Sequence, residues 1–243
     1  MVYDKMEMMT QELLLLAGTA AVIGLVHTLL GPDHYLPFIV ISKSGQWSLK
    51  KTATVTLLCG VGHVLGSVAL GLAGIALGAA VTSLVGIEAV RGQLAALALI
   101  AFGLGYGAWG LRQAWRNNPH RHIHVHSSGL SHSHGHTHHD DHVHIHGTDE
   151  NLTPWVLFTI FVLGPCEPLI PLLIYPAARS SLTGLLLVIA VFGAITVSTM
   201  LAVVLLSVRG LGLLPMQGLK RYMHALAGGA IFLSGLAIQV LGL

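Results

Sequence analysis

Long apolar segments occupy most of this sequence and limit the folds that it can adopt. Of its 243 residues, 53% are hydrophobic and 9% are charged, whereas about 25% are charged in a typical soluble domain. Several uninterrupted apolar runs reach the roughly 20 residues with which a helix crosses a bilayer. The sequence therefore predicts an all-α, polytopic membrane protein.

Hydropathy predicts six transmembrane helices, and a change in composition divides them into two groups of three. The predicted spans are Leu13–Ser42, Thr52–Leu84, Gln93–Leu111, Thr153–Ala178, Leu182–Val208 and Tyr222–Leu243. Residues 1–116 form a first transmembrane region, and residues 152–243 form a second one. Residues 117–151 between them contain too few apolar residues to bury a core, so we expect this loop to be disordered.

The basic residues predict how the chain crosses the membrane. One side carries Lys43, Lys50, Lys51, Arg112, Arg116, Arg121, Arg209, Lys220 and Arg221, and the other carries Lys5, Arg91 and Arg179. Since cytoplasmic loops are enriched in Lys and Arg, the first set is predicted to lie on the cytoplasmic side. Both termini are then predicted to lie on the outer side of the membrane, which we expect to be the cell (inner) membrane. The basic residues follow this topology and form no patch for nucleic acid, so we expect none as a partner.

The loop at residues 117–151 holds twelve of the sixteen histidines, most of them in a His-x-His pattern. They are His120, His122, His124, His126, His132, His134, His136, His138, His139, His142, His144 and His146. Neutral imidazole binds Zn, Cu, Ni and Co, and a flexible tract offers several ligands at once. The loop therefore indicates capture of a transition metal without naming the ion. A solvated linker and a pH-responsive charge cluster are the alternatives.

Two proline-containing stretches interrupt the first and fourth predicted spans. Gly31-Pro32-Asp33-His34 aligns with Gly164-Pro165-Cys166-Glu167 at an offset of 133 residues, which also aligns the other spans of the two halves. Because each half has three spans, the second half must be inverted relative to the first. The pattern predicts two inverted three-helix repeats with broken first and fourth helices, a design found in secondary transporters.

Each proline also frees the backbone carbonyl four residues before it. Pro165 frees the carbonyl of Phe161, and Pro168 frees that of Gly164. At membrane depth such groups need partners inside the protein. We expect them to act as additional ligands.

The polar residues near the breaks are the candidate metal ligands. A charged side chain at mid-membrane costs about 2.5–3.5 kcal/mol on insertion scales, which marks Asp33 and Glu167 as functional; the alternative is a protonated carboxyl bonded to a neighbouring helix. One divalent ion between the two would neutralise both charges. The full predicted set is His27, Asp33, His34, His63, Cys166 and Glu167. Imidazole with carboxylate suits Ni, Co or Zn better than Mg or Ca.

Three of the polar residues in apolar segments also have simpler interpretations. His27 on an apolar helix face could be a hydrogen-bonded core residue. Cys59, four residues before His63, is typical of a small buried hydrophobe. His224 follows two basic residues and could be interfacial.

The segment from His27 to Asp33-His34, with His63 on the second span, resembles the nickel/cobalt transporter families. The His-rich loop resembles that of their efflux permeases, and the Gly-Pro-Cys stretch is similar to urease-accessory-type and cytochrome c biogenesis-type transmembrane domains. The resemblance implies metal-ion transport with His27, Asp33, His34 and His63 as binding positions. The Gly-Pro insertion before Asp33 departs from the importers, which usually carry another acidic residue there, and leaves the ion and the direction open.

We therefore expect a permease for a divalent transition metal, Ni or Co, with export favoured over import and no tightly bound cofactor. A transmembrane thiol–disulfide carrier is the first alternative, although the position matching Cys166 is Asp33. A membrane metal sensor or chaperone is the second. No nucleophile–base pair or cofactor motif indicates an enzyme.

Overall fold

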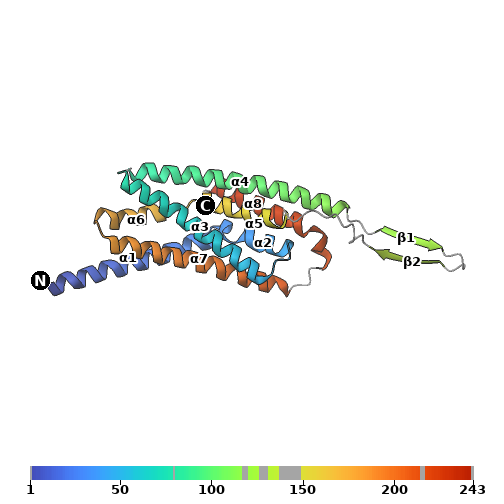
Figure 1. The fold of residues 1–243 in the computed structure, drawn as a ribbon, viewed down its shortest axis with the longest axis horizontal. Coiled ribbons are helices and arrows are strands. Elements are labelled where there is room, and N and C mark those ends of the chain that lie inside the picture. The colour runs from blue at the N-terminus through green and yellow to red at the C-terminus, as the bar shows by residue number, and fades with distance from the viewer. Residues whose placement is uncertain are drawn as a thin grey trace.

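The structure is a bundle of long helices with one short hairpin. It is a computed structural model that describes residues 2–78, 80–116, 120–125, 131–136, 149–213 and 217–241. The elements are α1 (Val2–Leu30), η1 (Pro32–His34), α2 (Leu36–Ser44), α3 (Leu49–Ala76), α4 (Val81–Arg116), β1 (His120–Val125), β2 (Ser131–His136), α5 (Asp149–Leu163), α6 (Leu169–Ala178), α7 (Leu182–Gly212), η2 (Gln217–Tyr222) and α8 (Met223–Leu241). Figure 1 shows the long helices running along one common direction.

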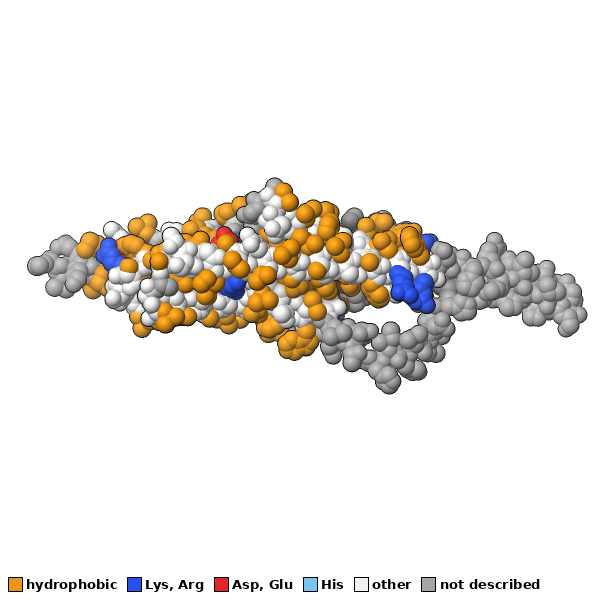
Figure 2. Space-filling model, turned by 90° about the horizontal axis from the view of Figure 1, so that it is seen from above, with side chains coloured by type: hydrophobic (Ala, Val, Ile, Leu, Met, Phe, Trp, Pro, Cys, Tyr) orange, Lys and Arg blue, Asp and Glu red, His pale blue; other side chains and the backbone are white. Residues whose placement is uncertain are grey.

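Five helices in the described part of the chain are long and apolar enough to cross a membrane. They are Met6–Leu30, Leu49–Ala76, Val81–Arg116, Leu182–Gly212 and Leu219–Val240, and Thr153–Leu163 and Leu169–Ala178 are shorter apolar helices. Hydrophobic side chains are spread over the whole face of the helical body seen in Figure 2, with few charged ones among them, and many large ones are exposed. A surface this apolar is suited to lipid rather than water. The chain is a helical, membrane-embedded protein.

The first predicted break is present, and Pro32 explains it. Helix α1 ends at Leu30, and Gly31 has an extended backbone (φ −87°, ψ 97°). A proline disfavours the helical conformation in the residue before it and cannot donate a backbone hydrogen bond. One short 3₁₀ turn, η1, carries Asp33 and His34 before α2 begins.

The second predicted break is present as well. Helix α5 ends at Leu163, and α6 begins at Leu169, with Pro168 as its N-cap. Prolines at 165 and 168 prevent helix from continuing through the five residues between α5 and α6. In Figure 1, α5 and α6 follow one another along the bundle, so this break lies inside the helical body rather than at its end.

The boundary between α3 and α4 differs from the prediction. Hydropathy placed a loop between Leu84 and Gln93, but α3 ends at Ala76 and α4 begins at Val81. Gly78, with φ +66°, provides the left-handed residue that commonly follows a helix C-terminus. As a consequence, Glu88 and Arg91 lie inside α4 instead of in a loop.

Part of the His-rich segment has regular structure. β1 and β2 pair as an antiparallel hairpin in which His120 is opposite His136, and Figure 1 shows it projecting from one end of the bundle. These twelve residues are in strands, and the disorder expected of the whole loop stays a prediction. The rest of residues 117–148 lies outside the described part of the chain.

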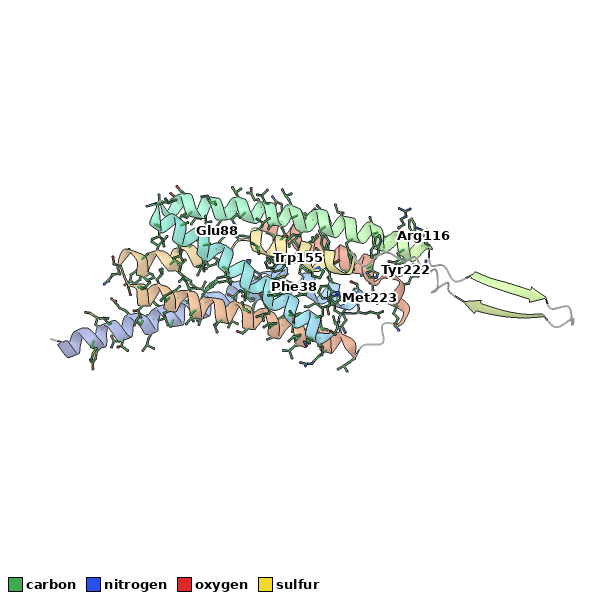
Figure 3. All side chains as sticks on the ribbon, viewed as in Figure 1. Phe38, Glu88, Arg116, Trp155, Tyr222 and Met223 are labelled. Atoms are coloured by element: carbon green, nitrogen blue, oxygen red, sulfur yellow. The ribbon has the colours of Figure 1, made fainter. Side chains whose placement is uncertain are left out.

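The interior consists of two apolar clusters, one around each short helix that follows a break. The first surrounds Phe38 of α2 and includes Cys59 and Phe161; Figure 3 shows Phe38 within the bundle. The second surrounds α6 and includes Cys166 and Phe192. Along the bundle, α4 packs against α8 and α1 packs against α7.

Candidate metal centre

Three histidines from α1, η1 and α3 meet inside the bundle. His27 is in the last turn of α1, His34 is in η1, and His63 is near the middle of α3. One ring nitrogen from each lies within 4.8 Å of the other two. The ring centroids are 4.7 Å apart for His27–His34, 5.0 Å for His34–His63 and 6.4 Å for His27–His63. Three imidazoles at these separations can bind one transition-metal ion.

Two of the rings are held by backbone carbonyls. Nδ1 of His34 is 3.1 Å from the carbonyl oxygen of Gly31, and Nδ1 of His63 is 3.2 Å from that of Phe161. With the proton on Nδ1, each ring donates to its carbonyl, and Nε2 carries a lone pair. Both Nε2 atoms are buried and have no hydrogen-bond partner among the described residues. This is the arrangement that orients histidine as a metal ligand.

Asp33 places a carboxylate beside this triad. Its Oδ1 is 3.2 Å from Nδ1 of His34, and its side chain is 22% exposed. The carboxylate therefore touches the ring of His34 while part of it faces open space. A negative charge at this position favours a bound cation and a histidine that donates from Nδ1.

The second break supplies a thiol and another carboxylate. Sγ of Cys166 is 3.7 Å from Nε2 of His27, and Cys166 is fully buried. Glu167 is exposed and lines a cavity of about 470 Å³ together with His27, Asp33, His34 and His63. The structure thus brings the three histidines into one group, with Cys166 in contact with it, Asp33 beside it and Glu167 on the cavity wall.

The carbonyls freed by the second break have partners other than a metal. The carbonyl of Phe161 accepts from His63, as described above, and Arg91 lies 3.3 Å from the carbonyl oxygen of Gly164. The expectation that these two carbonyls would be extra ligands is therefore replaced by a different role. They hydrogen-bond one histidine ring and one arginine.

Sequence reasoning missed three polar residues that surround the second break. Glu88, fully buried, forms an ion pair with Arg91 in α4; Figure 3 labels Glu88. Ser67 of α3 bonds both Arg91 and the backbone nitrogen of Cys166. An acid and a base three residues apart in an otherwise apolar stretch were a usable signal, because such residues are neighbours on a helix face.

Two weaker candidates lie away from the triad. His224 is 2.8 Å from the hydroxyl of Tyr106, and its ring packs against Trp109. Cys59 is buried in the first apolar cluster, and both cysteines are free. These contacts are consistent with a structural role for His224. The burial of Cys59 is consistent with a small hydrophobic core residue.

In comparisons with protein-family models, with curated proteins and with solved structures, none matches the chain.

Proposed function

We propose that this protein carries a divalent transition-metal cation across a membrane, with the ion bound between the two helix breaks. The observation that carries the proposal is the pair of buried, unpartnered Nε2 atoms of His34 and His63, with His27 completing the group. Buried polar atoms normally have a partner. A metal ion would satisfy both at once.

The donor set favours a borderline metal. Imidazole with one or two carboxylates and a thiol suits Ni, Co or Zn, whereas Mg and Ca take oxygen ligands. We propose Ni or Co as the transported ion, in line with the resemblance of the His27 to His34 segment to nickel/cobalt transporters. Zn is the alternative within the same ligand class.

Helix packing supports an inverted repeat of six spans. At the 133-residue offset, α1, α2, α3 and α4 correspond to α5, α6, α7 and α8. A two-fold axis would exchange the α1–α7 contact with α5–α3, the α2–α7 contact with α6–α3, and the α2–α8 contact with α6–α4, and each of these contacts is present. Such an axis would also pack α3 on α7 and α4 on α8, as observed. Transport by alternating access would then be a rearrangement of the two repeats around the histidines.

The basic residues and the His-rich segment suggest the orientation. We propose that this segment is cytoplasmic, that both termini are outside the inner membrane, and that the histidines raise the metal concentration at the inner mouth, which favours export. Deleting residues 118–147 should then lower the apparent affinity or rate without abolishing transport.

The thiol–disulfide carrier remains the alternative, because Cys166 touches His27 at the same site. A carrier needs a partner thiol, and Cys59 lies in the other apolar cluster. The double variant Cys59→Ser, Cys166→Ser separates the two functions. A redox carrier would lose all activity, whereas a metal transporter would only be weakened.

The direct test is metal flux in proteoliposomes with Ni, Co, Zn and Mn. We expect Asp33→Asn and Glu167→Gln to reduce flux, because each removes a charge from the cavity. Glu12→Gln is the matched control, since Glu12 is a half-buried carboxylate that pairs with Arg179 outside the cavity. Flux equal to wild type in both cavity variants would contradict the proposal.

A further inference from the structure

The backbone of the second break is held by side chains from two other helices. The N–H of Cys166 donates to Oγ of Ser67 at 3.1 Å and to Oε2 of Glu88 at 3.2 Å. Arg91 donates to the carbonyl oxygens of Val162 at 2.9 Å and Gly164 at 3.3 Å. One backbone N–H and two carbonyls near Cys166 are thus bonded to α3 or α4.

The two charged residues also satisfy one another. Nη1 of Arg91 bonds Oε1 of Glu88 and Oγ of Ser67, and Nη2 bonds the two carbonyls. Glu88 uses its other oxygen for the N–H of Cys166. A buried ion pair is tolerated when additional hydrogen bonds satisfy its remaining atoms, and the planar arginine fork suits this geometry.

We propose that Glu88 and Arg91 are positioning residues for the metal centre. They fix the backbone at Cys166 so that its thiol contacts His27, and they hold Glu167 at the cavity wall. The identification of the positioned groups as a metal centre rests on the proposed function; the holding of the break does not.

The backbone carbonyls of the first break have different hydrogen-bond partners. Val162 and Gly164 correspond to Leu29 and Gly31 at the 133-residue offset. The carbonyl of Leu29 accepts from the hydroxyl of Tyr35 at 3.3 Å, and that of Gly31 from His34. Carbonyls at matching positions therefore accept hydrogen bonds from residues nearby in sequence in the first break, and from an arginine distant in sequence in the second.

The same difference is visible in the helix packing. α5 packs against α4, the helix that carries Arg91, but the corresponding pair, α1 and α8, makes no comparable contact within the described ranges. The position matching Arg91 is His224, which bonds Tyr106. Glu88 and Arg91 therefore tie only the second break to its neighbouring helix, so their loss should loosen Cys166 selectively.

Alkylation of single cysteines by N-ethylmaleimide tests this selectivity without any metal. With Cys59→Ser as background, we expect Arg91→Gln to speed modification of Cys166 by about tenfold or more, because a loop that loses its hydrogen bonds opens locally. With Cys166→Ser as background, the rate at Cys59 should not change. Arg91→Lys should give an intermediate rate at Cys166, and Arg179→Gln, which removes an exposed arginine, should have no effect.

Metal affinity provides the second measurement. Loss of residues that orient metal ligands typically weakens affinity about 10–100-fold, and we expect this range for Co binding to Arg91→Gln and Ser67→Ala. If Arg91→Gln does not fold, the charge-balanced Glu88→Gln, Arg91→Gln double variant and Ser67→Ala are measured instead.

The outcomes separate the two proposals. Faster modification of Cys166 alone, with weaker Co binding, supports positioning of a metal centre. Equal acceleration at Cys59 and Cys166, or none at either, overturns it. Faster modification of Cys166 in a protein whose wild type binds no Co supports the holding of the break and overturns the proposed transport function.

Discussion

The thiol of Cys166 lies 3.7 Å from Nε2 of His27, although 139 positions separate the two residues. This contact brings a residue of the second break against the helix that leads into the first. His34 and His63 complete the group from η1 and α3. Both breaks therefore contribute to one group of side chains, which a movement of one break against the other would alter.

Replacement of His63 should abolish tight metal binding. We expect His63→Gln to lose more than the roughly 10–100-fold in affinity that is typical of residues that only orient ligands, because it removes a direct ligand. Isothermal titration with Co and Ni measures this. Thr56→Val on the same helix is the control, since the hydroxyl of Thr56 is also buried without a partner in the described part of the chain but does not line the cavity.

Replacement of Cys166 should change the selectivity of the site more than its capacity. Thiolate is a soft ligand, so we expect Cys166→Ser to reduce affinity for Zn and Co while affinity for Mn, which favours oxygen ligands, is retained. Cys59→Ser should leave the order of affinities as in wild type. Identical losses for all three metals would indicate that the thiol is not a ligand.

Gly228 in α8 should tolerate no side chain. A Cβ there would overlap the backbone of Gly107 in α4, whereas a Cβ at the adjacent Gly229 would meet nothing within 4 Å. We expect Gly228→Ala to destabilise the protein by about 1–3 kcal/mol, the usual effect of overpacking. Gly229→Ala should be neutral or stabilising by up to about 1 kcal/mol, because alanine favours helix. Unfolding in detergent tests this pair, and equal stability of the two variants would contradict close packing of α4 on α8.

The hydroxyl of Tyr106 should stabilise the junction of α2, α4 and α8. It lies 3.1 Å from Oγ of Ser44 and 2.8 Å from Nδ1 of His224. We expect Tyr106→Phe to cost about 0.5–1.5 kcal/mol, the usual net value of a hydrogen bond. A double-mutant cycle with His224→Leu should give a coupling energy of at least about 0.5 kcal/mol. Tyr175→Phe, at a tyrosine exposed on α6, is the control.

Local chemistry explains which features the sequence predicted. The breaks at Pro32 and Pro165 follow from proline itself, and the polar character of His63 in an apolar run needs no partner to be recognised. The roles of Glu88 and Arg91 could not be found in this way, because the carbonyls that Arg91 bonds lie 71 and 73 residues further along the chain. Hydropathy had placed both residues in a loop.

His34 joins two thermodynamic quantities that mutagenesis usually keeps apart. Its Nδ1 bonds the carbonyl of Gly31, which stabilises the break, while its Nε2 is buried with no hydrogen-bond partner among the described residues. His34→Ala would therefore lower the stability of the metal-free protein as well as the affinity for metal. The two effects can be measured separately, because a ligand that binds only the folded protein raises its free energy of unfolding. At about 100 times its Kd the ligand adds about 2.7 kcal/mol. The midpoint of unfolding without metal then reports how much His34 stabilises the break. The rise in that midpoint on adding metal reports how much His34 contributes as a ligand.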